Sequence, residues 1–244
     1  MEQFLSNDEQ INNIIKNINI TRTLFLSSII VGEPHIGKKR LALSLFPSAT
    51  VVDAAFEDVN ETIKKLDEVI ITNFEKVKNI DNLNFSNKRI VAIASYIGNK
   101  KLIEDKFAFI YQMPALQERT ADIKLLADYF LKEAKVNLMI EQDITLDYTT
   151  LDISHNIQSL KKSVYQELLY SSSSARDIEK IIYNFLLHEY NEEDGDIYKR
   201  FLALYERPLI QAGLDKYGSQ LKLSSILGIN RNTLRKKINE LDLN

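Results

Sequence analysis

The residues from Lys216 to Leu241, KYGSQLKLSSILGINRNTLRKKINEL, predict two helices joined by a tight turn. Apolar side chains recur at helical spacing on both sides of Gly228, which can supply the left-handed backbone that such a turn needs. Asn230 is placed to cap the second helix, which begins near Arg231. This order of elements is typical of a helix-turn-helix unit.

The outer face of the second helix is cationic and polar. Guanidinium and amide groups can read base edges, whereas ammonium and hydroxyl groups hold phosphates. We therefore expect base or near-base contacts from Arg231, Asn232 and Arg235, and phosphate contacts from Lys222, Thr233, Lys236 and Lys237. The alternative is a capped, solvated amphipathic helix, and the turn together with the one-sided charge favours double-stranded DNA as the partner.

The distribution of charge supports this interpretation. The whole chain of 244 residues has a formal net charge of −3. From Ser219 onward, however, five cationic side chains outnumber two acidic ones, so the positive charge lies where the second helix lies. The acidic remainder argues against a second large DNA surface.

The composition excludes several other classes of protein. The chain has no cysteine, which excludes disulfides and thiolate metal sites, and its three histidines lack the spacing of metal ligands, so no metal is expected. No apolar run reaches transmembrane length, and no membrane contact is expected. We expect a cytoplasmic bacterial protein associated with the nucleoid.

Strand and helix patterns alternate through residues 1–114, which predicts a parallel α/β sheet. The expected strands are Thr23–Val31, Ala49–Ala54, Glu68–Thr72, Arg89–Ser95 and Phe107–Gln112. Residues 115–190 show only helical patterns and are expected to form a lid. A turn-like acidic stretch at 191–195 then leads to an all-α domain over residues 196–244.

A phosphate-binding loop is indicated at Gly32–Lys39, GEPHIGKK, which has the spacing GxxxxGK between a strand and a helix. Gly32, Gly37 and Lys38 are the candidate nucleotide ligands. Lys39 replaces the usual hydroxyl residue, His35 stands where a small residue is usual, and Pro34 removes one amide donor. The alternative is a vestigial strand-to-helix turn.

The residues that should organise magnesium are altered. The strand Val69–Thr72 is followed by Asn73-Phe74-Glu75, where a working ATPase needs an acidic pair at the first two positions. Asn73 is neutral, and Glu75 comes one position late and is expected to point elsewhere. Hydrolysis is therefore expected to be lost and the chain not to be an enzyme, while binding of ATP or ADP without turnover stays open.

Three segments carry a family resemblance. Gly228–Lys237 closely resembles the turn and recognition helix of the Fis-type domain of bacterial enhancer-binding activators, and this resemblance covers Asp196–Leu243. The loop Gly32–Lys39, MPALQERTADI at 113–123 and SARDIE at 174–179 are similar to the GExGxGKE, PPLRERxEDI and NVRELEN segments of the AAA+ domain of the same activators. The implied fold is an AAA+-like (P-loop) parallel sheet, a helical lid and a Fis-type helix-turn-helix domain.

The resemblance also implies partners and roles. Arg176 matches the arginine that senses the γ-phosphate. Fis-type domains are dimers, which implies a homodimer through the C-terminal domain. Its core would come from Phe201, Leu204, Leu209 and Ile210.

Two parts of the family pattern are missing, namely the GAFTGA loop that grips the nitrogen-type sigma factor and the paired arginines that reach a neighbour's site. We therefore expect a shortened, degenerate member, a sequence-specific transcriptional regulator with a hydrolysis-deficient AAA+ remnant. One alternative is a compact active ATPase that depends on Lys38, Glu75 and Arg176. The other is an adaptor that contacts a full-length activator or the transcription machinery.

Overall fold

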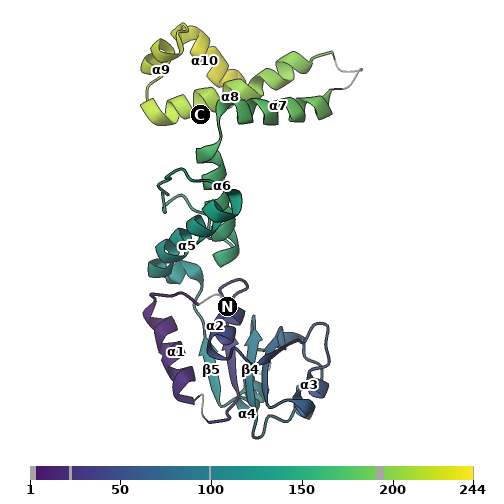
Figure 1. Cartoon of the computed structure of the whole chain (residues 1–244). Helices are drawn as coiled ribbons and strands as arrows, with labels where there is room; N and C mark the ends of the chain where they lie inside the picture. Colours follow the sequence, from purple (N-terminus) through teal and green to yellow (C-terminus); the bar gives the residue numbers. More distant parts are fainter. Residues whose placement is uncertain (1–3, 22–23, 99, 191–194, 244) are drawn as a thin grey trace. The chain divides into compact units, whose positions relative to one another are not determined.

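The computed structural model describes residues 4–21, 24–98, 100–190 and 195–243 (Figure 1). The chain divides into two compact units, residues 1–173 and 174–244. The first contains a sheet with flanking helices and a helical lid, and the second is helical. The fold is thus the expected AAA+-like parallel sheet and lid, followed by a helix-turn-helix domain.

The sheet has five strands in the order β2-β3-β4-β1-β5, and every described pairing is parallel. The strands are β1 Ser28–Val31, β2 Thr50–Asp53, β3 Glu68–Thr72, β4 Arg89–Ala94 and β5 Phe109–Gln112. The β-branched and apolar residues of the central strands β1, β3 and β4 are buried on both faces, as a parallel sheet covered by helices requires. In this arrangement the carboxyl ends of the strands share one edge.

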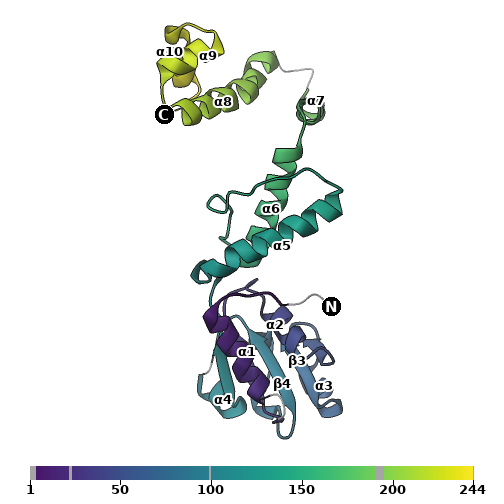
Figure 2. The same cartoon turned by 60° about the vertical axis from the view of Figure 1, so that its left-hand side comes forward.

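Each face of the sheet has its own helical cover (Figures 1 and 2). On one face, α1 Glu9–Thr21 and α2 Lys38–Leu45 contribute to a core with residues of β1, β3, β4 and β5. On the other face, α3 Val59–Lys65 and α4 Lys100–Lys106 contribute to a second core with residues of β1 to β4. Helix α4 was not predicted, because its seven residues bury only Ile103.

The first strand is shorter than the sequence suggested. It was expected from Thr23, which lies outside the described residues, but β1 begins at Ser28. Leu24, Phe25 and Leu26 are exposed and do not pair in the sheet. The apolar run therefore predicted a longer strand than the structure contains.

The lid consists of α5 Thr120–Leu138 and α6 Asn156–Ser172, joined to the sheet through the short 3₁₀ helix η3 Leu116–Glu118. Leu116, Leu126, Phe130, Leu160 and Val164 form the centre of its apolar core. Two further 3₁₀ helices, η1 Phe74–Lys76 and η2 Ile80–Asn82, follow β3. The lid core is separate from the two sheet cores, so the lid is a distinct layer of the first unit.

The second unit contains α7 Ala175–Glu189, α8 Ile197–Tyr217, α9 Gln220–Leu227 and α10 Arg231–Glu240. Ile210, Leu223, Leu234, Ile238 and Leu241 form most of its core. Pro208 lies inside α8, and the helix is continuous through this residue. In the described parts of the chain, no helix combines the length and the apolarity that crossing a bilayer demands.

The boundary between lid and C-terminal domain differs from the expected one. The lid was expected to continue to residue 190, but α7 falls in the second unit. The rings of Phe185 in α7 and Phe201 in α8 meet edge to face with centroids 5.8 Å apart, which joins these two helices. The expected linker at 191–195 lies outside the described residues except for Gly195.

Gly213 of α8 lies against Leu223 of α9, where there is no space for a side chain. A methyl group at Gly213 would come within 2.4 Å of Leu223 Cδ1, and Leu223 is buried. Gly213→Ala should therefore overpack the domain and lower its free energy of unfolding by about 1–3 kcal/mol, measured by denaturant unfolding of the full chain. Gly195→Ala is the control, because its methyl group would meet nothing within 4 Å. Equal stability of the two variants would contradict this packing.

Candidate functional site

The turn between α9 and α10 is built as the sequence predicted. Gly228 has a φ of +66°, in the left-handed region, and Ile229 N donates to Ser224 O at 3.1 Å to close α9. Asn230 Oδ1 accepts a hydrogen bond from Asn232 N at 2.8 Å and caps α10. The turn therefore fixes the direction in which α10 leaves α9.

Helix α10 separates its apolar residues from its polar ones. Leu234 and Ile238 are buried in the domain core. The candidate DNA contacts Arg231, Asn232, Thr233, Arg235 and Lys236 are all exposed. Neither Arg231 nor Arg235 has an ion-pair partner among the described residues, whereas Lys236 faces Glu240 of its own helix at 3.7 Å. The structure thus brings these five residues together on one solvent-facing surface.

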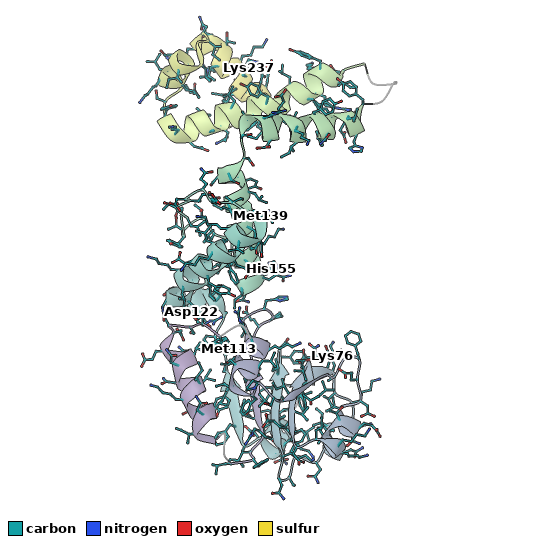
Figure 3. All side chains as sticks on the ribbon, in the orientation of Figure 1. Lys76, Met113, Asp122, Met139, His155 and Lys237 are labelled. Atoms are coloured by element: carbon teal, nitrogen blue, oxygen red, sulfur yellow. The ribbon has the colours of Figure 1, made fainter. Side chains whose placement is uncertain are left out.

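The two remaining candidate phosphate ligands lie differently. Lys222 is exposed, and its ammonium lies 5.2 Å from the centre of the Tyr217 ring. Lys237 is half-buried, and its Nζ donates to Glu206 Oε1 of α8 (Figure 3). The Lys237 ammonium therefore holds α10 against α8, and Glu206, thirty-one positions earlier, is a partner that helical spacing could not reveal.

The candidate phosphate loop has an unusual backbone. Gly37 has a φ of +102°, and His35 has a φ of +61°, which a residue with a side chain adopts at a cost of roughly 1 kcal/mol. Glycine is required at position 32, because a Cβ there would lie 2.5 Å from Met113 O. The loop thus keeps the glycines that a phosphate cradle needs and adds one strained histidine.

Three successive carbonyls of this loop accept hydrogen bonds from residues far away in the sequence. Pro34 O accepts from Asn156 Nδ2 at 3.1 Å, and His35 O accepts from Ile157 N at 3.1 Å. Ile36 O accepts from an Arg119 guanidinium nitrogen at 3.0 Å. In the described part of the chain, the amides of His35 and Gly37 have no acceptor, which leaves them available as in a backbone anion site.

Lys38 lies within this loop and is only 7% exposed. Its Nζ donates to Gly32 O at 2.5 Å and to Glu33 O at 2.6 Å. Burial lowers the pKa of Lys38 to about 8, and the negative charges of Glu75 and Glu33 oppose this shift. The ammonium is therefore in place for a phosphate, although it is engaged by the carbonyls of its own loop.

The expectation that Glu75 points elsewhere was wrong. Asn73 has a φ of +53°, so the chain turns directly into η1 after β3. This turn buries Phe74 and places Glu75 in the cavity beside the loop, with its charge acting on Lys38 and its Oε2 accepting from Ser95 N at 3.2 Å. A carboxylate therefore faces Lys38 from one position later than in the expected acidic pair.

The side chain of Asn73 is hydrogen-bonded to Asp53 at the end of the neighbouring strand. Its Nδ2 donates to Asp53 Oδ1 at 2.8 Å across the ends of β2 and β3. This hydrogen bond, with a second one from the Ala55 amide, lowers the pKa of Asp53. The edge where magnesium would bind thus presents an amide–carboxylate pair.

A cavity of about 1150 Å³ opens beside the loop within the first unit. Its lining includes Lys38, Asp53 and Glu75 from the sheet side, and Phe130 and Lys161 from the lid. The volume is that of a cleft for a ligand of nucleotide size. Arg176, the candidate γ-phosphate sensor, is an exposed residue of α7 in the second unit, whereas Gly32, Gly37 and Lys38 belong to the first.

Two buried residues that the sequence analysis gave no role organise this site. The Arg119 side chain is 1% exposed and lies 3.3 Å from Asp122 Oδ2, besides its bond to the loop. Asp122 also accepts from Ser6 Oγ at 2.7 Å and from Asn7 N at 2.6 Å (Figure 3). The available signals were the spacing of three between these residues and their place in the 113–123 segment that resembles the family.

Comparisons with known proteins agree with this architecture. The family described as "Bacterial regulatory protein, Fis family" matches residues 201–241. A putative Fis-like DNA-binding protein of Pseudomonas aeruginosa is 32% identical over 100 residues, which cover 41% of this chain and 95% of that protein. The DNA-binding transcriptional regulator NtrC of Azospirillum brasilense is 28% identical over 169 residues. That match covers 54% of this chain, which spans only 35% of the NtrC chain.

The fold has a counterpart among solved structures. The crystal structure of NtrX from Brucella abortus in complex with ATP superimposes with a TM-score of 0.55 at 13% identity, covering 99% of this chain and 69% of that one. The chain belongs to the Fis family of bacterial regulatory proteins, as an NtrC-like chain in which a Fis-type helix-turn-helix domain follows an AAA+ fold.

Proposed function

We propose that the chain is a sequence-specific DNA-binding transcriptional regulator whose AAA+ portion does not hydrolyse ATP. The observation that carries the proposal is the exposed polar and cationic face of α10, supported on its other side by buried Leu234 and Ile238. A helix supported in this way can enter the major groove without distorting its own domain. The match to the Fis family of bacterial regulatory proteins, over residues 201–241, includes α10.

Within α10 the proposed contacts divide by chemistry. Arg231, Asn232 and Arg235 read base edges, because their planar groups can form paired hydrogen bonds. Lys222, Thr233 and Lys236 hold phosphates. Lys237 contributes mainly by holding α10 on α8 through Glu206.

We further propose that the DNA-binding form is a homodimer through α7 and α8. Of the four expected core residues, Ile210 is 2% exposed within its own domain, and Phe201 packs on Phe185. Leu204 and Leu209 remain 44% and 39% exposed. The same two helices expose further apolar side chains, which are Ile178, Ile181, Tyr183, Leu187, Tyr198 and Tyr205. A second copy would bury this surface and present two α10 helices to successive major grooves, about 34 Å apart.

The phosphate loop is proposed to bind ATP or ADP without turnover. The free amides, the Lys38 ammonium and the adjoining cavity support binding. The neutral Asn73, whose amide is committed to Asp53, argues against the organisation of Mg²⁺ and water. The solved NtrX structures that contain ATP and ADP show the fold with such ligands.

One observation favours the second candidate, a compact active ATPase. Glu75 faces Lys38 within the cavity and could supply the carboxylate that Asn73 lacks. Phosphate release by the purified chain decides between the two. ATP-dependent release that disappears in both Lys38→Ala and Glu75→Gln would establish the ATPase and refute the hydrolysis-deficient account.

Replacing Arg235 tests the proposed reading of bases. Arg235→Ala should weaken binding to the preferred sequence by about 1–3 kcal/mol and relax the choice of base at one position, because a bidentate contact to guanine is lost. Binding is measured by fluorescence anisotropy on the preferred duplex and on single-base variants. The matched control is Lys236→Ala, which should weaken all sequences equally and reduce the salt dependence. A uniform loss in Arg235→Ala would leave that residue only a phosphate role.

The pKa of Lys38 predicts how nucleotide affinity changes with pH. Its ammonium is charged below pH 8 and loses its proton as the pH rises through about 8 in the free protein. The affinity for ADP, measured by calorimetry, should therefore fall between pH 7 and pH 9.5. In Lys38→Met the affinity should be low and should lack this component. Equal affinities of the unsubstituted protein at both pH values would show that Lys38 does not hold the phosphates.

Stability should show the opposite trend in the absence of nucleotide. The pKa of Lys38 is about 8 in the folded protein and 10.5 as an ordinary lysine, so the unfolded chain binds more protons between these values. The contribution of Lys38 to the free energy of unfolding therefore rises as the pH is raised from 8 toward 10.5. Denaturant unfolding gives the free energies of unfolding of the protein and of Lys38→Met. Over this interval, the free energy of the unsubstituted protein should increase relative to that of Lys38→Met. A pH-independent difference would contradict the lowered pKa.

A further inference from the structure

We infer that Asn156 is a positioning residue that holds the phosphate loop in its anion-binding conformation from the lid. The inference rests on the proposed nucleotide site and assigns to this lid residue a part in building it. Asn156 is the first residue of α6, is 5% exposed and lies more than a hundred positions from the loop. It does not touch the amides that would meet the phosphates, so its effect acts through the loop.

The carboxamide of Asn156 uses its acceptor and its donors on three separate partners. Its Oδ1 accepts from Leu116 N at 2.8 Å, at the joint between sheet and lid. Its Nδ2 donates to Pro34 O at 3.1 Å and to Glu33 Oε2 at 2.9 Å, both in the loop. One side chain therefore ties the loop, the joint and the start of α6 together.

The backbone of Asn156 is shaped for this task. Its φ is +56°, in the left-handed region that asparagine tolerates better than most residues with a side chain. Ile157 follows directly and donates its amide to His35 O at 3.1 Å. The two residues thus hold successive loop carbonyls, at 34 and 35, away from the phosphate side.

The loop needs such support because of its own sequence. His35 has a φ of +61° where the resembling family has glycine, so this conformation is not intrinsically favoured. The hydrogen bonds from Asn156 and Ile157 go to the carbonyls on either side of the His35 α-carbon, which are Pro34 O and His35 O. Without them, the loop would be expected to relax and to turn its amides out of the anion site.

The chemistry requires asparagine rather than aspartate. An aspartate at position 156 would place a second carboxylate against Glu33 and against the carbonyl of Pro34, with no donor for either. Glycine would accept the left-handed backbone but would lose all three bonds. The two replacements therefore separate the hydrogen bonds from the backbone conformation.

The test compares Asn156→Asp and Asn156→Gly with the unsubstituted full-length chain. Asn137→Asp is the matched control, because Asn137 is also a lid asparagine and bonds only the Tyr165 hydroxyl at 2.9 Å among the described residues. ADP affinity is measured by calorimetry well below the unfolding temperature. Both Asn156 variants should bind ADP at least about tenfold more weakly, the control should bind normally, and DNA affinity should not change.

Amide hydrogen exchange without nucleotide provides the second measurement. Exchange at the Ile157 amide, which donates to His35 O of the loop, should rise in both Asn156 variants, and exchange in α10 should remain unchanged. A purely structural asparagine would instead raise exchange throughout the lid and lower the unfolding temperature. If exchange at Ile157 is unchanged in both variants, the inference is wrong. If exchange at Ile157 rises but the unsubstituted protein binds no ADP, the positioning role holds and the proposed nucleotide binding fails.

Discussion

The buried pair of Arg119 and Asp122 is the interaction on which the first unit depends. Arg119 bonds the carbonyl of Ile36 in the phosphate loop, and Asp122 bonds the chain before α1 through Ser6 and Asn7. A charge pair this deeply buried is stable only while its two members remain paired. The N-terminal segment, the loop and the lid are therefore fixed together.

In the C-terminal domain, α10 is also held in place by buried residues and by a hydrogen bond to another helix. The polar face of α10 can be exposed because its apolar face is buried and Lys237 is bonded to Glu206 on α8. In both units, the residues that would contact a ligand are held by others that would not. In the first unit this support holds the loop of the proposed nucleotide site, and in the second it holds the helix that is proposed to read DNA. The proposed regulator thus combines a supported DNA-binding helix with a phosphate loop beside the neutral Asn73, where a carboxylate was expected.

Much of the architecture could be predicted from local patterns. The five strands, the turn at Gly228 and the cap at Asn230 follow from apolar periodicity and from the backbone preferences of glycine and asparagine. The direction of Glu75 could not be predicted, because it depends on a left-handed turn at Asn73. The roles of Lys237, Arg119 and Asn156 also could not, because each depends on a partner far away in the sequence. The alternation of strand and helix patterns in the sequence does not predict such contacts.

Selection of binding sites from random duplex DNA by the purified 244-residue chain tests whether it reads DNA sequence. The account predicts enrichment of a two-fold symmetric sequence whose half-sites lie about one helical turn apart. It also predicts that Arg231→Glu and Arg235→Glu abolish the enrichment while the protein stays folded. Failure of the unsubstituted chain to enrich any sequence, or enrichment that survives both substitutions, would contradict the account.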